Sequence, residues 1–319
     1  MSKPYVEDQS ADNPMAGIGF LILGLFVFSV QDVIMKFFSD QMAVQEVIFA
    51  RGVVTLVLIS SAIYFTQGLR GFVTQRLFLN CLRGFFSFIC FSTFSMSLAV
   101  LPLADAMPLY YTAPLFVVIL AGPFLGETVG FRIWIAIVAG LIGVIFVARP
   151  SADGIEPAMI LAIVSAIAYS VQILLTRLLG SSDSALGMTF YLTLMFVLFS
   201  GLTGLVFGSG WMNQFDHPSA AYLFRAWSVP NSIQAGLFLA VGLTGAIGFF
   251  CISQAYRYGR ANQMAPFEYS SLPFAVLWGW MFWGSLPTVS TILGSVLIVG
   301  GGLFIVYSEF RGSRKQAVA

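Results

Sequence analysis

Apolar residues run along this chain in long, nearly continuous stretches instead of short alternating patterns. A helix needs about 20 mainly apolar residues to cross the hydrocarbon core of a bilayer. Ten stretches meet this requirement, and they cover residues 15–37, 43–66, 77–99, 103–125, 130–148, 156–178, 185–208, 232–256, 261–285 and 288–308. Continuous apolar runs do not fit the alternation of a transmembrane β-strand. Because helices satisfy their own backbone hydrogen bonds, the pattern predicts an all-α integral membrane protein with ten transmembrane helices.

The joints between these stretches are mostly short and carry turn or charge signals, as at Ser39-Asp40. One joint is long, from residue 209 to residue 231, and is predicted to be an interfacial loop that contains a short helix. The first fourteen residues are polar, and no small-residue cleavage site follows the first apolar stretch. That stretch is therefore predicted to be a retained span, not a signal peptide.

Lysine and arginine residues in the short loops predict the orientation of the chain. With a cytoplasmic N-terminus, ten of them fall on the inner side: Lys3, Arg70, Arg76, Arg132, Arg177, Arg257, Arg260, Arg311, Arg314 and Lys315. Three fall outside: Lys36, Arg149 and Arg225. This asymmetry predicts a multi-pass protein of the cell inner membrane with both termini in the cytoplasm.

The composition supports the membrane assignment and excludes several kinds of partner. Charged residues make up 9% of the chain, against roughly 25% in soluble domains, so membrane lipids are expected to cover most of the surface. The 15 Lys and Arg residues form no basic run outside the C-terminal tail, which argues against nucleic-acid binding. Three cysteines within apolar stretches and a single histidine offer no metal site. No phosphate-binding loop occurs, so no cofactor is predicted.

Two pairs of short motifs indicate an internal duplication. Residues 28–31 (Phe-Ser-Val-Gln) match residues 169–172 (Tyr-Ser-Val-Gln) at an offset of 141. Residues 108–111 (Pro-Leu-Tyr-Tyr) match residues 266–269 (Pro-Phe-Glu-Tyr) at an offset of 158. The matches occur in the same order and in corresponding stretches, and the longer second offset agrees with the long joint in the second half.

The duplication predicts two five-helix repeats, covering residues 15–150 and 151–308, with cytoplasmic tails at 1–14 and 309–319. Five spans per repeat is an odd number, so the second repeat must enter the membrane from the opposite side. Inverted repeats of this kind allow a protein to exchange inward-open and outward-open states. This architecture favours a transporter over a membrane enzyme.

Charged residues inside apolar stretches are candidate site residues, because each costs about 2.5–3.5 kcal/mol on insertion scales. Arg51, Arg83 and Glu268 lie in such positions. We expect the arginines to bind an anionic group of a substrate, and Glu268 to bind a cationic group or a proton. Alternatively, the arginines reach lipid phosphates or pair with a carboxylate that locks two helices together. Asp105, near the end of its stretch, is predicted to cap a helix.

Uncharged polar residues form a second candidate set for substrate binding. They are Gln31, Tyr110, Tyr111, Gln172, Gln254, Tyr269, Ser270 and Ser271. Amides and phenols offer hydrogen bonds without a charge penalty, which suits a site that must bind and release. Gln31 and Gln172 occupy equivalent repeat positions, so both face the pseudo-two-fold axis or each forms an interhelical hydrogen bond.

Prolines in the fourth and ninth stretches are predicted to kink those helices and free backbone carbonyls near the site. They are Pro108, Pro114, Pro266 and Pro273.

The chain resembles the drug/metabolite transporter superfamily, EamA type. The resemblance rests on residues 49–52 (Phe-Ala-Arg-Gly), 82–84 (Leu-Arg-Gly), 101–106 (Leu-Pro-Leu-Ala-Asp-Ala), 114–116, 125–127 (Leu-Gly-Glu), 143–144, 149–150, 254–256 and 261–273. It extends over residues 15–308 and implies ten helices, cytoplasmic termini and a central cavity. It also implies uptake or efflux of metabolites such as amino acids, nucleosides, vitamins or S-adenosylmethionine. Glu127 matches a glutamate of the family, but its counterpart is Ser285, so a symmetric ion site is not expected.

These observations predict a secondary transporter that moves a small organic metabolite by alternating access, with proton coupling or exchange. One alternative is an integral-membrane enzyme acting on lipid, for which the sequence offers no nucleophile, acid–base pair or metal site. We therefore expect no enzymatic activity. The other alternative is a non-transporting membrane subunit, and an interior filled with apolar side chains would favour it. The sequence leaves a monomer and a homodimer equally open.

Overall fold

The computed structural model describes residues 14–125, 131–149, 155–179, 184–258 and 267–318. Within these ranges every regular element is a helix. The elements are α1 (Pro14–Phe38), α2 (Val44–Gln67), the 3₁₀ helix η1 (Gly68–Phe72), α3 (Leu77–Leu98), α4 (Leu103–Tyr110), α5 (Ala113–Leu125), α6 (Phe131–Ala148), α7 (Pro157–Leu179), α8 (Ala185–Phe207), α9 (Pro218–Phe224), α10 (Ser232–Tyr258), α12 (Ser271–Trp283) and α13 (Val289–Val318).

Many of these helices have the length and composition of membrane spans. Seven segments of the described chain qualify by both criteria, and α6, α12 and α13 contribute shorter apolar helices. Helical residues occur in each of the ten ranges predicted from the apolar pattern, with the ninth range described only in part. The chain is therefore a multi-pass membrane protein whose described regular elements are all helices.

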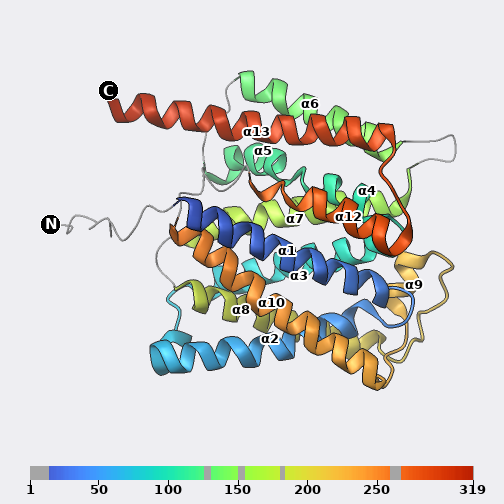
Figure 1. Ribbon diagram of the computed structural model, residues 1–319. Helices are drawn as coiled ribbons and strands as arrows, with labels where there is room; N and C mark the ends of the chain where they lie inside the picture. The colour runs from blue at the N-terminus through green and yellow to red at the C-terminus, as the bar shows by residue number, and fades with distance from the viewer. Residues whose placement is uncertain (1–13, 126–130, 150–154, 180–183, 259–266, 319) are drawn as a thin grey trace.

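The helices lie side by side along a common direction, as Figure 1 shows. Helix α1 begins and α13 ends at the same end of the bundle, called here the terminal end. Helix α9 lies at the opposite end, called here the α9 end (Figure 1). Four helix pairs make the most extensive contacts: α6 with α13, α1 with α10, α3 with α7, and α2 with α8.

Glycines allow the closest of these helix approaches. A Cβ added to Gly143 in α6 would lie 2.7 Å from the carbonyl oxygen of Gly294 in α13. A Cβ on Gly294 would lie 2.5 Å from the carbonyl oxygen of Gly143. The two backbones therefore touch where they cross, which is the role of small residues in membrane helix packing.

The long joint between α8 and α10 contains α9, so the predicted short helix in that loop is confirmed. His217 caps it, because its Nδ1 accepts a hydrogen bond from the Ser219 N–H at 3.3 Å. The other ring nitrogen of His217 lies 2.9 Å from Oε1 of Glu156, which precedes α7. His217 therefore connects this loop to the first helix of the second half of the chain.

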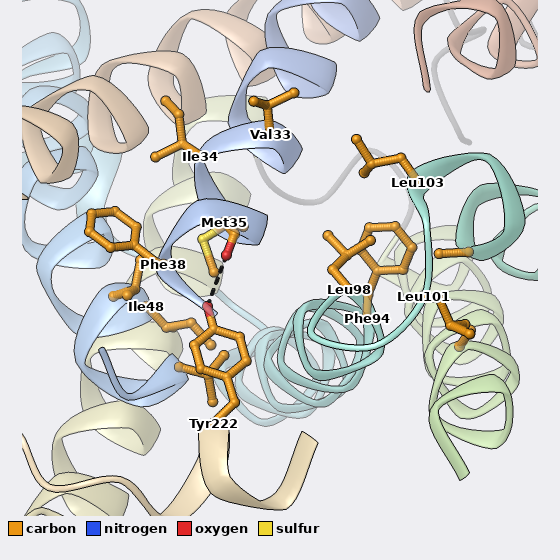
Figure 2. Packing of buried hydrophobic residues seen from close by; sticks show 14 of the residues in the cluster. Val33, Ile34, Met35, Phe38, Ile48, Phe94, Leu98, Leu101, Leu103 and Tyr222 are labelled. Atoms are coloured by element: carbon orange, nitrogen blue, oxygen red, sulfur yellow. Dashed lines mark hydrogen bonds between the residues drawn. The ribbon is translucent and has the colours of Figure 1, made fainter. Parts of the chain in front are cut away.

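The largest apolar cluster lies at the α9 end (Figure 2). It joins the last turns of α1 and α3 to the first turns of α2 and α4, with residues such as Phe38, Ile48 and Leu98 fully or almost fully buried. Tyr222 of α9 is fully buried against it and donates a hydrogen bond to the Met35 carbonyl at 3.2 Å. Burial raises the pKa of the Tyr222 phenol, so this hydroxyl remains a donor.

Candidate substrate-binding site

Two helices are interrupted near the middle of the bundle. Helix α4 ends at Tyr110, and α5 begins at Ala113 after a two-residue turn. A second turn, at Tyr269 and Ser270, precedes α12. The predicted interruptions in the fourth and ninth stretches are thus confirmed.

Prolines explain both interruptions. Pro114 and Pro273 lie in the first turn after each break, and neither has a backbone N–H to donate to the carbonyl four residues earlier. Those carbonyls belong to Tyr110 and Tyr269. Pro266 lies outside the described residues, as does Glu127.

The two breaks occur at positions that the internal repeat equates, and they bring Tyr111 and Tyr269 together. The ring centroids of these tyrosines are 5.5 Å apart. Ser271, at the start of α12, donates a hydrogen bond to the Tyr111 Oη at 2.6 Å. The Tyr269 hydroxyl is buried and has no hydrogen-bond partner. The breaks therefore place one satisfied and one unsatisfied phenol in contact.

Two further phenols extend this contact into a row. Tyr110 lies 5.5 Å from Tyr111 between ring centroids, and Tyr169 of α7 lies 5.3 Å from Tyr110. We call Tyr110, Tyr111, Tyr169 and Tyr269 the tyrosine cluster. Glu268 interacts electrostatically with all four phenols. Glu268 and three of the four tyrosines keep part of their surface accessible, whereas Tyr269 is buried.

A buried arginine and a buried aspartate lie next to this cluster. Arg51 of α2 is only 3% exposed, and its guanidinium lies 4.2 Å from the ring centroid of Phe91 and 5.6 Å from that of Phe196. Asp32 of α1 is 8% exposed and interacts electrostatically with Arg51 and Tyr111. Between these two described residues no direct ion pair forms, and Nη1 of Arg51 has no hydrogen-bond partner.

The sequence analysis did not single out Asp32, although its position carried a clear signal. It lies within the first apolar stretch, where a carboxylate is costly, and it follows Gln31 directly. Gln31 itself is 2% exposed, and its Oε1 has no hydrogen-bond partner. Residues 31 and 32 of α1 are therefore both buried polar side chains, and Asp32 is the one that interacts with the cluster.

The remaining predicted site residues lie in different surroundings. Arg83 of α3 is buried and donates a hydrogen bond to the Met188 carbonyl of α8, so it links two helices, as one of its two alternatives expects. The partner is a backbone carbonyl instead of the carboxylate named in that alternative. Gln172 of α7 and Gln254 of α10 are partly buried.

The prediction that Asp105 caps a helix is wrong. The N-cap of α4 is Pro102, and no side chain caps this helix. The Asp105 carboxylate instead accepts a hydrogen bond from Thr291 Oγ1 at 2.6 Å and lies 3.6 Å from Arg149 Nη2. A hydroxyl donor on α13 and the Arg149 cation compete successfully with the helix N-terminus for this carboxylate, so Asp105 joins α4 to α13.

Comparisons with known proteins give a consistent picture of relatedness. The model of the EamA-like transporter family matches residues 15–149 and 156–307. An S-adenosylmethionine uptake transporter of Rickettsia conorii is 26% identical over 303 residues, covering 95% of this chain and 96% of the relative. A riboflavin transporter of Rhizobium johnstonii is 32% identical over 220 residues, covering 69% of this chain and 67% of the relative.

Export is also represented among the relatives. The pseudopaline exporter CntI of Pseudomonas aeruginosa is 26% identical over 287 residues, covering 89% of this chain and 93% of the relative. A solved crystal structure superposes with a TM-score of 0.58 at 16% identity, over 92% of this chain and 96% of the other. The last similarity shows a shared fold.

Proposed function

Because the chain belongs to the EamA-like transporter family, we propose that it is a secondary transporter that works by alternating access. Its relatives are named for metabolite uptake and metabolite export, so the chain is a small-molecule transporter. The proposal adds the mechanism: two halves related by an inverted repeat that expose one site to each side in turn. Coupling to protons or exchange of two solutes drives the cycle.

The helix packing supports the inverted repeat. If residues 15–150 and 151–308 are the two repeats, α1 corresponds to α7, α3 to α10, and α5 to α12. The contact of α1 with α10 then corresponds to the contact of α7 with α3. In the same way, the contact of α5 with α7 corresponds to the contact of α12 with α1. The remaining extensive pairs, α2 with α8 and α6 with α13, each join two equivalent helices. Such matched pairs are expected of a pseudo-two-fold axis.

The contacts at the α9 end support a state closed on that side. Besides the apolar cluster, Lys36 donates hydrogen bonds to the Leu98 and Leu101 carbonyls at 2.6 and 2.7 Å. Arg225 donates to the Ser39 and Met42 carbonyls at 2.9 and 3.0 Å. In the proposed cycle these contacts break when the site opens toward the α9 end.

We place the α9 end outside the cell and the terminal end in the cytoplasm of a cell with an inner membrane. The excess of Lys and Arg in the loops predicted at the terminal end supports this orientation. The tails 1–14 and 309–319 are then cytoplasmic. Helix α13 extends to Val318, so the second tail continues the last helix.

The substrate site is proposed to be the tyrosine cluster with Glu268, Gln31 and Arg51, and now Asp32. The observation that carries this proposal is the meeting of four phenols and a carboxylate at two helix breaks in equivalent repeat positions. Broken helices are where transporters of inverted-repeat folds form their sites. Arg83, Gln172 and Gln254 stay predicted members of the site.

Transport in liposomes tests the proposal directly. Purified full-length protein is reconstituted, and uptake of labelled S-adenosylmethionine, riboflavin and a panel of amino acids and nucleosides is followed with and without a proton gradient. We expect saturable uptake of at least one compound, abolished in a Tyr111→Ala variant that still elutes as a folded protein. No movement of any compound under either condition would contradict transport and favour a non-transporting subunit or a lipid-modifying enzyme.

A further inference from the structure

We propose that the tyrosine cluster and Glu268 form a recognition site for an organic cation, such as a quaternary ammonium or sulfonium group. The inference rests on the site named above, but its test requires binding alone and no transport. It assigns a charge to the substrate, which membership of the family leaves open.

The geometry of the phenols is the first support. The four rings come from α4, the break after it, α7 and the turn before α12, so they approach one region from separate helices. Neighbouring centroids lie 5.3 to 5.5 Å apart. Aromatic faces attract onium groups through their quadrupole, and a row of rings offers several such faces to a cation that cannot donate hydrogen bonds.

The carboxylates are the second support. Glu268 interacts with every phenol of the cluster, and Asp32 interacts with Tyr111. Arg51 is the cation that faces Asp32, and its guanidinium is held against Phe91 and Phe196. Arg51 interacts with Asp32, whereas the carboxyl that interacts with every ring of the cluster is Glu268. A ligand beside the four rings therefore meets a carboxylate, which favours a cation over an anion.

An unsatisfied hydroxyl is the third support. Tyr269 is 8% exposed, and its Oη has no hydrogen-bond partner. The adjacent Ser270 Oγ also lacks one. Buried hydroxyls without partners are costly in a folded chain. The Tyr269 hydroxyl is packed against Gly302 of α13, so Ser270, which is partly exposed, is the hydroxyl that the polar part of a ligand would meet.

The names of the relatives do not settle this question, because they include compounds of different charge. The structure makes the choice through the residue types at the breaks. The repeat position that holds Tyr110 in the first half holds Glu268 in the second half. This difference places a carboxylate at the second break where the first break has a neutral phenol.

The experiment compares a cation with its uncharged isostere. Choline and 3,3-dimethylbutan-1-ol have the same shape and differ in the quaternary nitrogen. Binding of each compound to the purified full-length protein is measured by calorimetry and by the shift in unfolding temperature. We expect choline to bind at least tenfold more tightly than the alcohol, with the preference reduced about tenfold in Glu268→Gln.

Ring variants separate the cation–π contribution from hydrogen bonding. Tyr111→Phe keeps the aromatic face and should retain choline binding within about threefold, whereas Tyr111→Leu should weaken it about tenfold. Size-exclusion elution identifies variants that fail to fold, and Tyr64→Phe on the exposed face of α2 is the matched control.

The assignment is wrong if choline and 3,3-dimethylbutan-1-ol bind with equal affinity, or if neither compound binds. It is also wrong if the preference is unchanged in Glu268→Gln. The proposed transport function survives either result if the liposome assay moves a neutral or anionic metabolite. Conversely, a charge preference without any transport would retain the cation site and reject the transporter.

Discussion

Arg51 and Asp32 show how a membrane interior accommodates charge at the level of single residues. The arginine is almost completely buried against two phenylalanine rings, and the aspartate reduces its electrostatic cost without contacting it. Removing one member of such a pair leaves the other uncompensated, which destabilises more than removing both. The pair is therefore expected to contribute to folding as well as to binding.

A double-mutant cycle tests this expectation. Asp32→Asn should lower the free energy of unfolding by about 2 kcal/mol, less than the roughly 3–5 kcal/mol lost when a direct buried ion pair is broken. Asp32→Asn combined with Arg51→Met should recover at least half of that loss. Chemical unfolding in detergent micelles gives the values for Asp32→Asn, for Arg51→Met and for the double variant, and strictly additive effects would show that the two side chains do not interact.

The residues of the site were predictable only in part from the sequence. Glu268, Tyr110, Tyr111 and Tyr269 stood out as polar residues in apolar stretches near prolines. Tyr169 appeared only as part of a repeat motif, because a phenol in an apolar helix is as compatible with ordinary packing as with a site. Its place beside Tyr110 depends on the packing of α4 against α7, which no local pattern reveals.

At the level of helices, the breaks after α4 and before α12 determine where the site lies. An unbroken helix from Leu103 to Leu125 would carry Tyr111 and its neighbours along a regular helical path instead of a turn. Pro114 prevents this, because the Tyr110 carbonyl has no N–H to accept from four residues later. The prolines predicted the region of each break, since proline acts through its own covalent structure and needs no tertiary partner. They did not predict the residue at which the helix ends, because Pro108 lies inside α4.

Restoring the missing N–H tests the importance of the break. Pro114→Ala should leave the unfolding temperature unchanged or higher, because alanine favours the helix by about 3 kcal/mol. Substrate uptake should fall about tenfold, since small misplacements of positioned groups have effects of at least this size. Pro157→Ala is the matched control, because Pro157 occupies the first position of α7, where a proline costs nothing. If Pro114→Ala takes up substrate as fast as the unchanged protein, transport does not depend on the break after α4.

At the level of the whole molecule, the two ends of the bundle differ although the two halves are related. The α9 end holds the largest apolar cluster, whereas the clusters described elsewhere are much smaller. The joint between α8 and α10 is longer than the equivalent joint between α2 and α3, which holds the short helix η1, and its helix α9 contributes Tyr222 to this closure. Apolar stretches predicted the helices but not this asymmetry, because interhelical contacts depend on which faces meet.

Opening of the α9 end should therefore respond to a single hydrogen bond. Tyr222→Phe removes the bond to the Met35 carbonyl, which contributes about 1 kcal/mol, and should raise the population of the open state about fivefold. The reporter is Ala106→Cys in the apolar cluster, in a background where Cys81, Cys90 and Cys251 are replaced by serine. Its labelling by a membrane-impermeant maleimide should be about fivefold faster in Tyr222→Phe vesicles, and unaffected by Tyr64→Phe. Equal labelling rates with and without the Tyr222 hydroxyl would mean that α9 does not hold this end closed.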